Sequence, residues 1–237
     1  MTNIGVRAVA QSLLTALAYN PVSHIVRMTV NHVNINYIDG SGTPYDPFVP
    51  QSDEIVKNVQ IQSLEFSDNR FENLMYVQEM LAIFKSKQLR QTLRAFRINE
   101  DLLKEKGVIM LMNKIKSCAG LELLHISNCK IQSTGISCAL CILDYNKLYV
   151  KSLSIAGCAL KTQNQVRQLA QYVKNCVTYT KRENFEFLDI TQVISSIAHA
   201  EAFVEELGGV RIQKIAVRKE SPDVALVLKR VCDRVEL

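Results

Sequence analysis

The sequence predicts an α/β solenoid, a horseshoe-shaped coil of repeats in which a parallel sheet forms the concave face and helices form the convex face. Three observations predict it. A strand-sized apolar pattern is followed each time by a helix-sized one. The pair recurs along most of the chain at a spacing of roughly 30 residues, which is within the range of known repeat proteins. A glycine also recurs at the same offset in successive repeats.

The clearest repeat occupies residues 121–143. Its strand and turn follow the spacing L-x-x-L-x-L-x-x-C-x-L, filled by Leu121, Leu124, Ile126, Cys129 and Ile131. Alternate strand positions share a face, so Leu124 and Ile126 point to the same side. A helix opens at Gly135 and has apolar residues at i, i+3, i+4 and i+7, namely Ile136, Ala139, Leu140 and Leu143. This stripe predicts that the helix packs against the apolar face of the strand.

The same template recurs on both sides of this repeat. Its first apolar position falls at Ile25, Ile61, Leu93, Val150, Phe185 and Ile212. Gly107 stands at the same offset as Gly135, and so does Gly5, which places Met1 inside a repeat. We therefore expect that the chain is a piece of a longer protein that begins mid-repeat, or that another element covers the open N-terminal end.

The last two predicted helices carry end signals. Gly208 and Gly209 follow the helix predicted over 194–207 and suit its C-terminal cap. Ser221 and Pro222 suit the start of the next helix, whose inward stripe would be Val224, Leu228, Val231 and Val235. This pattern predicts a helix over 221–237 that caps the solenoid.

In template and repeat length the chain resembles leucine-rich-repeat proteins of the ribonuclease-inhibitor-like kind. The resemblance covers nearly all of residues 1–237 and implies a single solenoid domain. Proteins of this family mostly hold other proteins. The resemblance therefore implies a non-enzymatic protein-interaction module or a structural subunit of a multiprotein complex. It also leaves open a substrate-recognition or regulatory adaptor of the ubiquitin-ligase or GTPase-regulator type.

Residues 39–50, DGSGTPYDPFVP, interrupt the second repeat with two glycines and three prolines. No regular element continues through such a segment. One interpretation is a surface loop, because closure entropy grows slowly with loop length. The other is an extended partner-binding segment that docks Tyr45 and Phe48 into a groove.

Strand side chains that do not enter the core are expected to line the concave face. The central column would be Thr29, Glu65, Arg97, His125, Ser154, Asp189 and Ala216. One flank would be Arg27, Ser63, Ala95, Leu123, Ser152, Phe187 and Lys214, and the other Asn31, Ser67, Asn99, Ser127, Ala156, Thr191 and Arg218. We predict that this mixed polar face binds partner proteins, with Leu123 and Phe187 as contact anchors.

His125, Ser154 and Asp189 share the central column, but their order does not suit a catalytic triad. The histidine of a triad lies between the nucleophile and the acid, whereas here Ser154 lies between the other two. No phosphate-binding glycine motif occurs, and the histidines lack metal-ligand spacing. We therefore predict no catalytic residue, no metal and no cofactor.

Charge and cysteine content limit the remaining classes. The net charge is +5, and 28 Lys and Arg are interleaved with 23 Asp and Glu, so an RNA-binding subunit of a large particle is an alternative that is not favoured.

Seven cysteines at core or helix positions predict free thiols in a reducing, intracellular compartment. The first 38 residues contain no acid, and with Arg7, Ser12 and an amphipathic run they suit a mitochondrial targeting segment. Their apolar residues also continue the helix stripe of the solenoid, and this interpretation favours the cytoplasm. No segment has the length of a membrane span.

Overall fold

The computed structural model describes residues 27–31, 62–67, 87–99, 103–129, 131–218 and 222–236, together with Val77, Leu81 and Phe84. For the first strand it describes the backbone and the register, not the side chains. The insertion at 39–50, with Tyr45 and Phe48, and the N-terminal stretch around Gly5 lie outside the described residues. The predictions made for them stay predictions.

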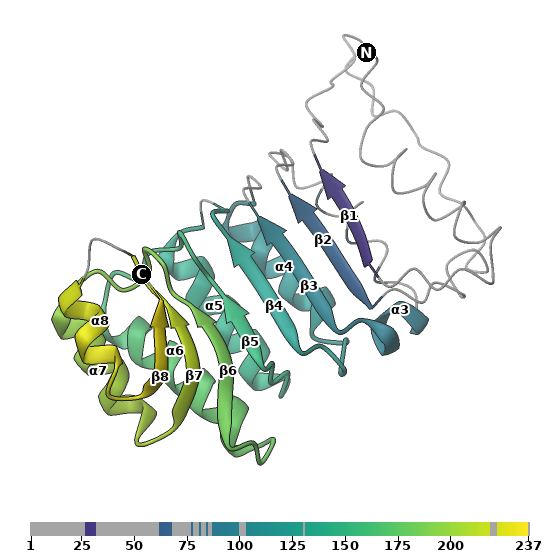
Figure 1. Ribbon diagram of the computed structural model, residues 1–237. Helices are drawn as coiled ribbons and strands as arrows, with labels where there is room; N and C mark the ends of the chain where they lie inside the picture. Colours follow the sequence, from purple (N-terminus) through teal and green to yellow (C-terminus); the bar gives the residue numbers. More distant parts are fainter. Residues whose placement is uncertain are drawn as a thin grey trace, which may run out of the picture.

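The described strands form one parallel sheet in which spatial order equals sequence order, from β1 to β8 (Figure 1). They are β1 (Arg27–Asn31), β2 (Ser63–Ser67), β3 (Ala95–Asn99), β4 (Leu123–Ser127), β5 (Ser152–Ser154), β6 (Asn184–Asp189), β7 (Arg211–Ala216) and β8 (Cys232–Glu236). Every neighbouring pair is parallel, which a right-handed coil of strand and helix units requires. The chain is thus an α/β protein with a solenoid-like arrangement, as the sequence predicts.

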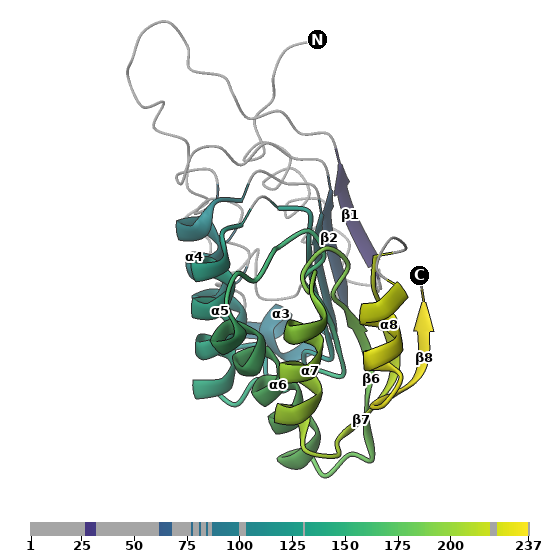
Figure 2. The same ribbon diagram turned by 90° about the vertical axis from the view of Figure 1, so that its left-hand side faces the viewer.

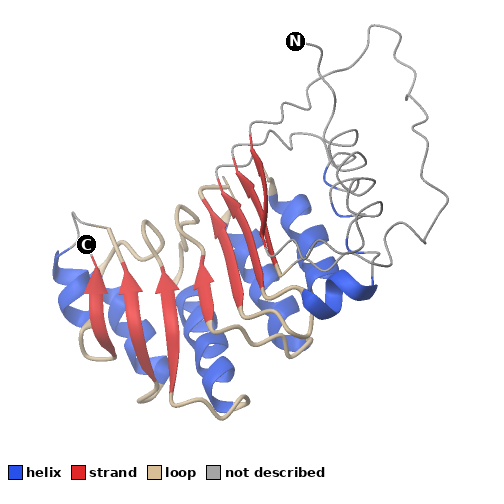
Figure 3. Cartoon of the chain, turned by 45° about the vertical axis from the view of Figure 1, so that its right-hand side comes forward, coloured by secondary structure: helices blue, strands red, loops and turns tan. Residues whose placement is uncertain are grey.

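The described helices alternate with the strands and lie on one side of the sheet, so within the described part of the chain the other face, here called the helix-free face, carries no helix (Figures 2 and 3). They are α3 (Lys87–Thr92), α4 (Glu105–Ile115), α5 (Ser133–Tyr145), α6 (Gln163–Thr178), α7 (Ile197–Leu207) and α8 (Pro222–Leu228). Helix α6 starts with a capping box in which Thr162 and Gln165 satisfy each other's backbone N–H groups. Gly208 ends α7 in the left-handed conformation, as expected for a C-terminal cap. None of the helices in the described part of the chain is long and apolar enough to cross a lipid bilayer.

The template residues form a continuous core between the sheet and the helices. Leu124 and its counterparts in β2, β3, β5, β6 and β7 are at most 1% exposed: Leu64, Phe96, Leu153, Leu188 and Ile215. Cys129 and Cys158 occupy the same turn position in successive repeats. Their Sγ atoms lie 3.6 Å and 3.8 Å from strand carbonyls of the preceding repeat, those of Ile98 and Ile126, and nearer still to the carbonyls of Ser127 and Ala156 in their own repeats. These buried thiols therefore pack where successive repeats meet.

The recurring glycine has a packing reason. A Cβ on Gly107 would come within 2.6 Å of Leu103 Cδ1, and a Cβ on Gly135 within 2.8 Å of Ile131 Cγ2. Leu103 and Ile131 are the last apolar position of the template in their repeats. The glycine thus lets the first turn of each helix approach the apolar side chain that closes the preceding turn.

The C-terminal end differs from the prediction of a capping helix over 221–237. Helix α8 ends at Leu228, and Cys232–Glu236 form an eighth strand paired with β7. Val231 and Val235 fit a helical stripe, but Cys232 and Val235 also fit the first two apolar positions of the strand template. Pairing with β7 satisfies backbone groups at its edge, such as Ile212 N–H with Val231 O at 2.9 Å. This gain in hydrogen bonding favours a strand over a longer helix.

Candidate functional site: the helix-free face of the sheet

The helix-free face carries the columns that the template predicts, described as backbone register for β1 and with side chains for the later strands. The register places Thr29, Glu65, Arg97, His125, Ser154, Asp189 and Ala216 side by side on successive strands. One flank runs through Arg27, Ser63, Ala95, Leu123, Ser152, Phe187 and Lys214, as predicted. The other flank is in register only from Asn31 to Ser127, because β5 has three residues and Ala156, Thr191 and Arg218 lie beyond the strands. Their proposed role in binding a partner stays a prediction.

Serine and aspartate side chains form a chain of hydrogen bonds across three strands of this face. Ser154, which is 1% exposed, donates to Asp189 with 2.8 Å between Oγ and Oδ2. Ser127 Oγ lies 2.7 Å from Ser154 Oγ. A hydroxyl has one proton, and Ser154 gives its proton to the carboxylate, so Ser127 must be the donor in this second bond. Asp189 also accepts the backbone N–H of Thr191 at 3.1 Å. The network is satisfied internally and fixes the carboxylate.

His125 lies beside this network and contacts a different serine. Its Nε2 is 3.0 Å from Ser152 Oγ, and its ring centroid is 5.9 Å from that of Phe187. Burial disfavours the charged ring and Arg97 repels it, which together lower the pKa of His125 to about 4. The imidazole is therefore neutral at physiological pH and acts here as a polar aromatic surface.

An ion-paired group adjoins Phe187 on the last two strands. Lys214 Nζ lies 5.2 Å from the centre of the Phe187 ring and 2.8 Å from a carboxylate oxygen of Glu236. Arg234 contacts the other oxygen of Glu236 at 3.1 Å. The hydrogen bond from Lys214 is the main cause that lowers the pKa of Glu236. The helical pattern over 221–237 does not predict that Arg234 and Glu236 lie on this face. The template spacing from Cys232 to Val235 indicates the strand that carries them.

Further along the face, Arg97 donates from Nη1 to Ser63 Oγ at 3.3 Å. Leu123 and Phe187, the predicted anchors, are both partly exposed. The face thus offers partly exposed apolar side chains within a polar surface whose hydrogen-bonding and charged groups are held in place by neighbours. Such a surface can bind another protein without first having to order its own side chains.

The geometry does not assemble a triad. His125 contacts Ser152, while Ser154 gives its proton directly to Asp189, so the imidazole does not lie between the hydroxyl and the acid. Within the described ranges, no three His, Cys, Asp or Glu side chains gather closely enough to hold a metal ion. All seven cysteines have free thiols, and Cys138 and Cys141 are exposed on α5.

Comparison with known proteins adds no assignment. No protein-family model matches the chain, and no curated protein has a similar sequence.

Proposed function

We propose that the protein is a leucine-rich-repeat-type, non-enzymatic interaction module or structural subunit that binds a partner protein on the helix-free face. The observation that carries the proposal is the cluster of His125, Phe187 and Lys214, in which a partly exposed aromatic ring is flanked by a neutral imidazole and an ion-paired lysine. Aromatic side chains in a polar surround are typical centres of protein interfaces.

Nucleic acid is the less favoured occupant of this face. Lys214 and Arg234 both contact Glu236, and Arg97 donates to Ser63. A phosphate backbone would have to compete with these carboxylate and hydroxyl partners. Nucleic-acid sites usually present a continuous basic surface instead. The ion pairs also favour an adaptor or scaffold over an RNA-binding subunit of a large particle.

A matched pull-down tests the proposal. The bait would be the wild-type chain, a variant with Phe187→Ala and Lys214→Glu, or a control with Arg167→Glu and Lys161→Glu, which lie away from this face. We expect proteins that are retained by the wild type and the control and lost by the first variant. Equal retention by all three baits would contradict the proposal. If binding falls steeply with salt and is abolished by nuclease, the occupant is a nucleic acid instead.

A further inference from the structure

A pair of stacked tyrosines lies at the edge of the solenoid where the helices end and the strands begin. The rings of Tyr149 and Tyr179 have centroids 5.4 Å apart and planes that differ by 11°. Tyr179 is 67% exposed, and Tyr145, the last residue of α5, is 88% exposed. Exposed aromatic side chains of this kind are enriched where proteins bind partners. This edge is separate from the helix-free face, so a partner bound on that face does not account for these exposed rings.

Two successive repeats present a lysine at this edge through the same strained turn. Lys147 follows α5 with φ 55°, and Lys181 follows α6 with φ 54°. In both turns the lysine N–H bonds three residues back and the next N–H bonds five residues back. Glycine is the usual residue at such a left-handed position, as Gly208 is after α7. A lysine there costs stability, and strain that is kept at equivalent positions suggests a function for the side chain.

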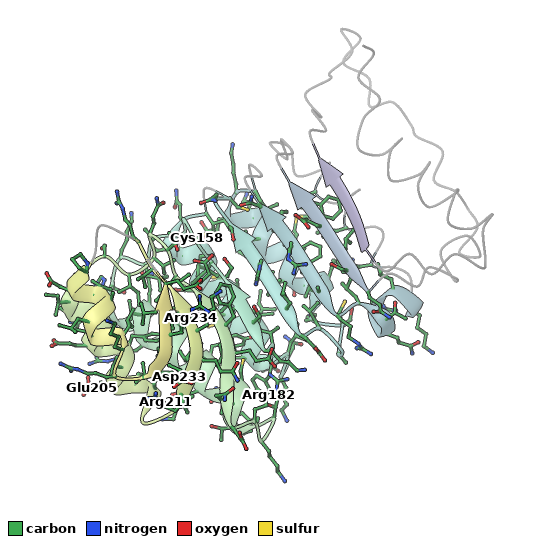
Figure 4. All side chains as sticks on the ribbon, viewed as in Figure 1. Cys158, Arg182, Glu205, Arg211, Asp233 and Arg234 are labelled. Atoms are coloured by element: carbon green, nitrogen blue, oxygen red, sulfur yellow. The ribbon has the colours of Figure 1, made fainter. Side chains whose placement is uncertain are left out.

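The backbone that carries Tyr149 is held from both sides. Tyr172, which is buried, donates its hydroxyl to Leu148 O at 2.7 Å. Arg182 donates from Nη1 to Val150 O at 2.8 Å and from Nη2 to Tyr149 O at 3.5 Å. Figure 4 shows Arg182 at the edge where the strands begin. The tyrosine pair is therefore pre-organised, and binding to it would cost little ordering entropy.

Two lysines at this edge, Lys147 and Lys181, can form ion pairs with a partner. Among the described residues neither Lys147 nor Lys181 forms an ion pair, and both are exposed. By contrast, Lys151 lies 3.1 Å from Glu122 and 4.0 Å from Glu186. The edge thus combines flat aromatic surface with two unpaired cations at the ends of adjacent helices, and charge complementarity favours an acidic partner.

We propose that this tyrosine edge, made of Tyr145, Lys147, Tyr149, Tyr179 and Lys181, binds an acidic, proline-containing segment of a partner protein. Proline rings in the extended polyproline conformation pack on exposed aromatic faces, and carboxylates between them would pair with the two lysines. Single-stranded nucleic acid fits less well, because its backbone needs a continuous basic groove, whereas Lys151 is already paired with two carboxylates.

Fluorescence anisotropy with the full chain tests the proposal. The probes are labelled peptides of alternating glutamate and proline, or lysine and proline, and a labelled single-stranded oligonucleotide of similar length. We expect the glutamate peptide to bind best. Tyr179→Ala and the double change Lys147→Glu with Lys181→Glu should each weaken binding by about tenfold or more. Lys161→Glu, at the opposite edge, should leave binding unchanged. Glu183→Lys, which replaces an exposed acid two residues after Lys181, should strengthen it.

Replacing both lysines with glycine separates function from folding. Glycine relieves the left-handed strain, so the variant K147G/K181G should melt at a higher temperature than the wild type while binding the glutamate peptide more weakly. A more stable variant with undiminished binding would overturn the proposal. The same conclusion follows if the glutamate peptide does not bind, if the lysine peptide binds equally well, or if the oligonucleotide binds more tightly than either peptide.

Discussion

Ser154 and Asp189 face each other on neighbouring strands, and the hydroxyl of one donates to the carboxylate of the other across 2.8 Å. Ser154 is buried, although it belongs to a column of side chains that points away from the core. The hydrogen bond explains how a hydroxyl is tolerated there, because a buried polar group without a partner is costly.

The pair should be coupled in a double-mutant cycle. Asp189→Ala removes the acceptor of a buried hydroxyl, and we expect it to lower the free energy of unfolding by about 1–2 kcal/mol. Ser127 remains as a partner for Ser154, which keeps the cost moderate. The double variant with Ser154→Ala should lose less than the sum of the two single variants, by about 1 kcal/mol. Urea denaturation measures all four proteins, and additive losses would contradict the predicted coupling.

Gly135 should resist substitution although it lies in a helix. Alanine improves helix propensity by about 1 kcal/mol, but its Cβ would come within 2.8 Å of Ile131 Cγ2 and 3.4 Å of Glu105 Cα. The branched Ile131 side chain and the backbone cannot easily move. We therefore expect Gly135→Ala to lower the free energy of unfolding by about 1–2 kcal/mol. Gly107→Ala, where the three nearest atoms all belong to side chains and none to the backbone, should cost less in the same denaturation series.

The sheet could be predicted from the sequence because each repeat contains its own pattern for a strand, a turn and a helix. If the repeats stack in sequence order, their strands must pair in the same order. Template alignment alone gave the column from Glu65 to Asp189 in its correct register. The last strand is predicted as part of a helix because Val231 and Val235 suit a helical stripe, whereas Cys232 and Val235 suit the strand template, and only pairing with β7 decides between the two. The local sequence pattern does not contain information about this backbone pairing, which is a tertiary interaction.

The details of the surface could be predicted less well. Alignment placed His125 next to Ser154, but the imidazole contacts Ser152 diagonally, which depends on rotamers. The tyrosine edge was missed entirely. Tyr149 and Tyr179 belong to different repeats at positions outside the template, and the left-handed turn at Lys147 has no glycine to signal it. Features that depend on loops between repeats are not encoded in the periodic pattern.

The cysteines should divide into two classes of reactivity. Burial is the main cause that raises the pKa of Cys118 and Cys176 to about 12 and that of Cys158 to about 11, so their thiols are protonated as well as inaccessible. Cys138 and Cys141 are exposed. We expect brief treatment of the native protein with iodoacetamide to modify only these two, and treatment in denaturant to modify all seven. Peptide mass spectrometry would identify the sites, and rapid native labelling of Cys158 would contradict the structure.

His125 should make the protein less stable in mild acid. Its pKa is about 4 in the folded protein against 6.5 for an ordinary histidine, so between these values the unfolded chain binds more protons. The stability contributed by the neutral ring is present in full above pH 6.5. It is lost progressively as the pH falls towards 4, and the total is up to about 3 kcal/mol. Asp189 and Glu65 act in the opposite direction by favouring the charged ring, but burial and Arg97 outweigh them.

The variant His125→Gln isolates this effect, because glutamine keeps a hydrogen bond to Ser152 available and does not titrate. Carboxylates elsewhere in the chain also titrate near pH 4, but they do so in both proteins. The difference in free energy of unfolding between wild type and variant should therefore shrink or change sign as the pH falls from 7 to about 4. Denaturation at several pH values measures it. A difference that stays constant over this range would mean that the ring is protonated equally easily in the folded and unfolded states, and thus that it is not shielded on the face as described.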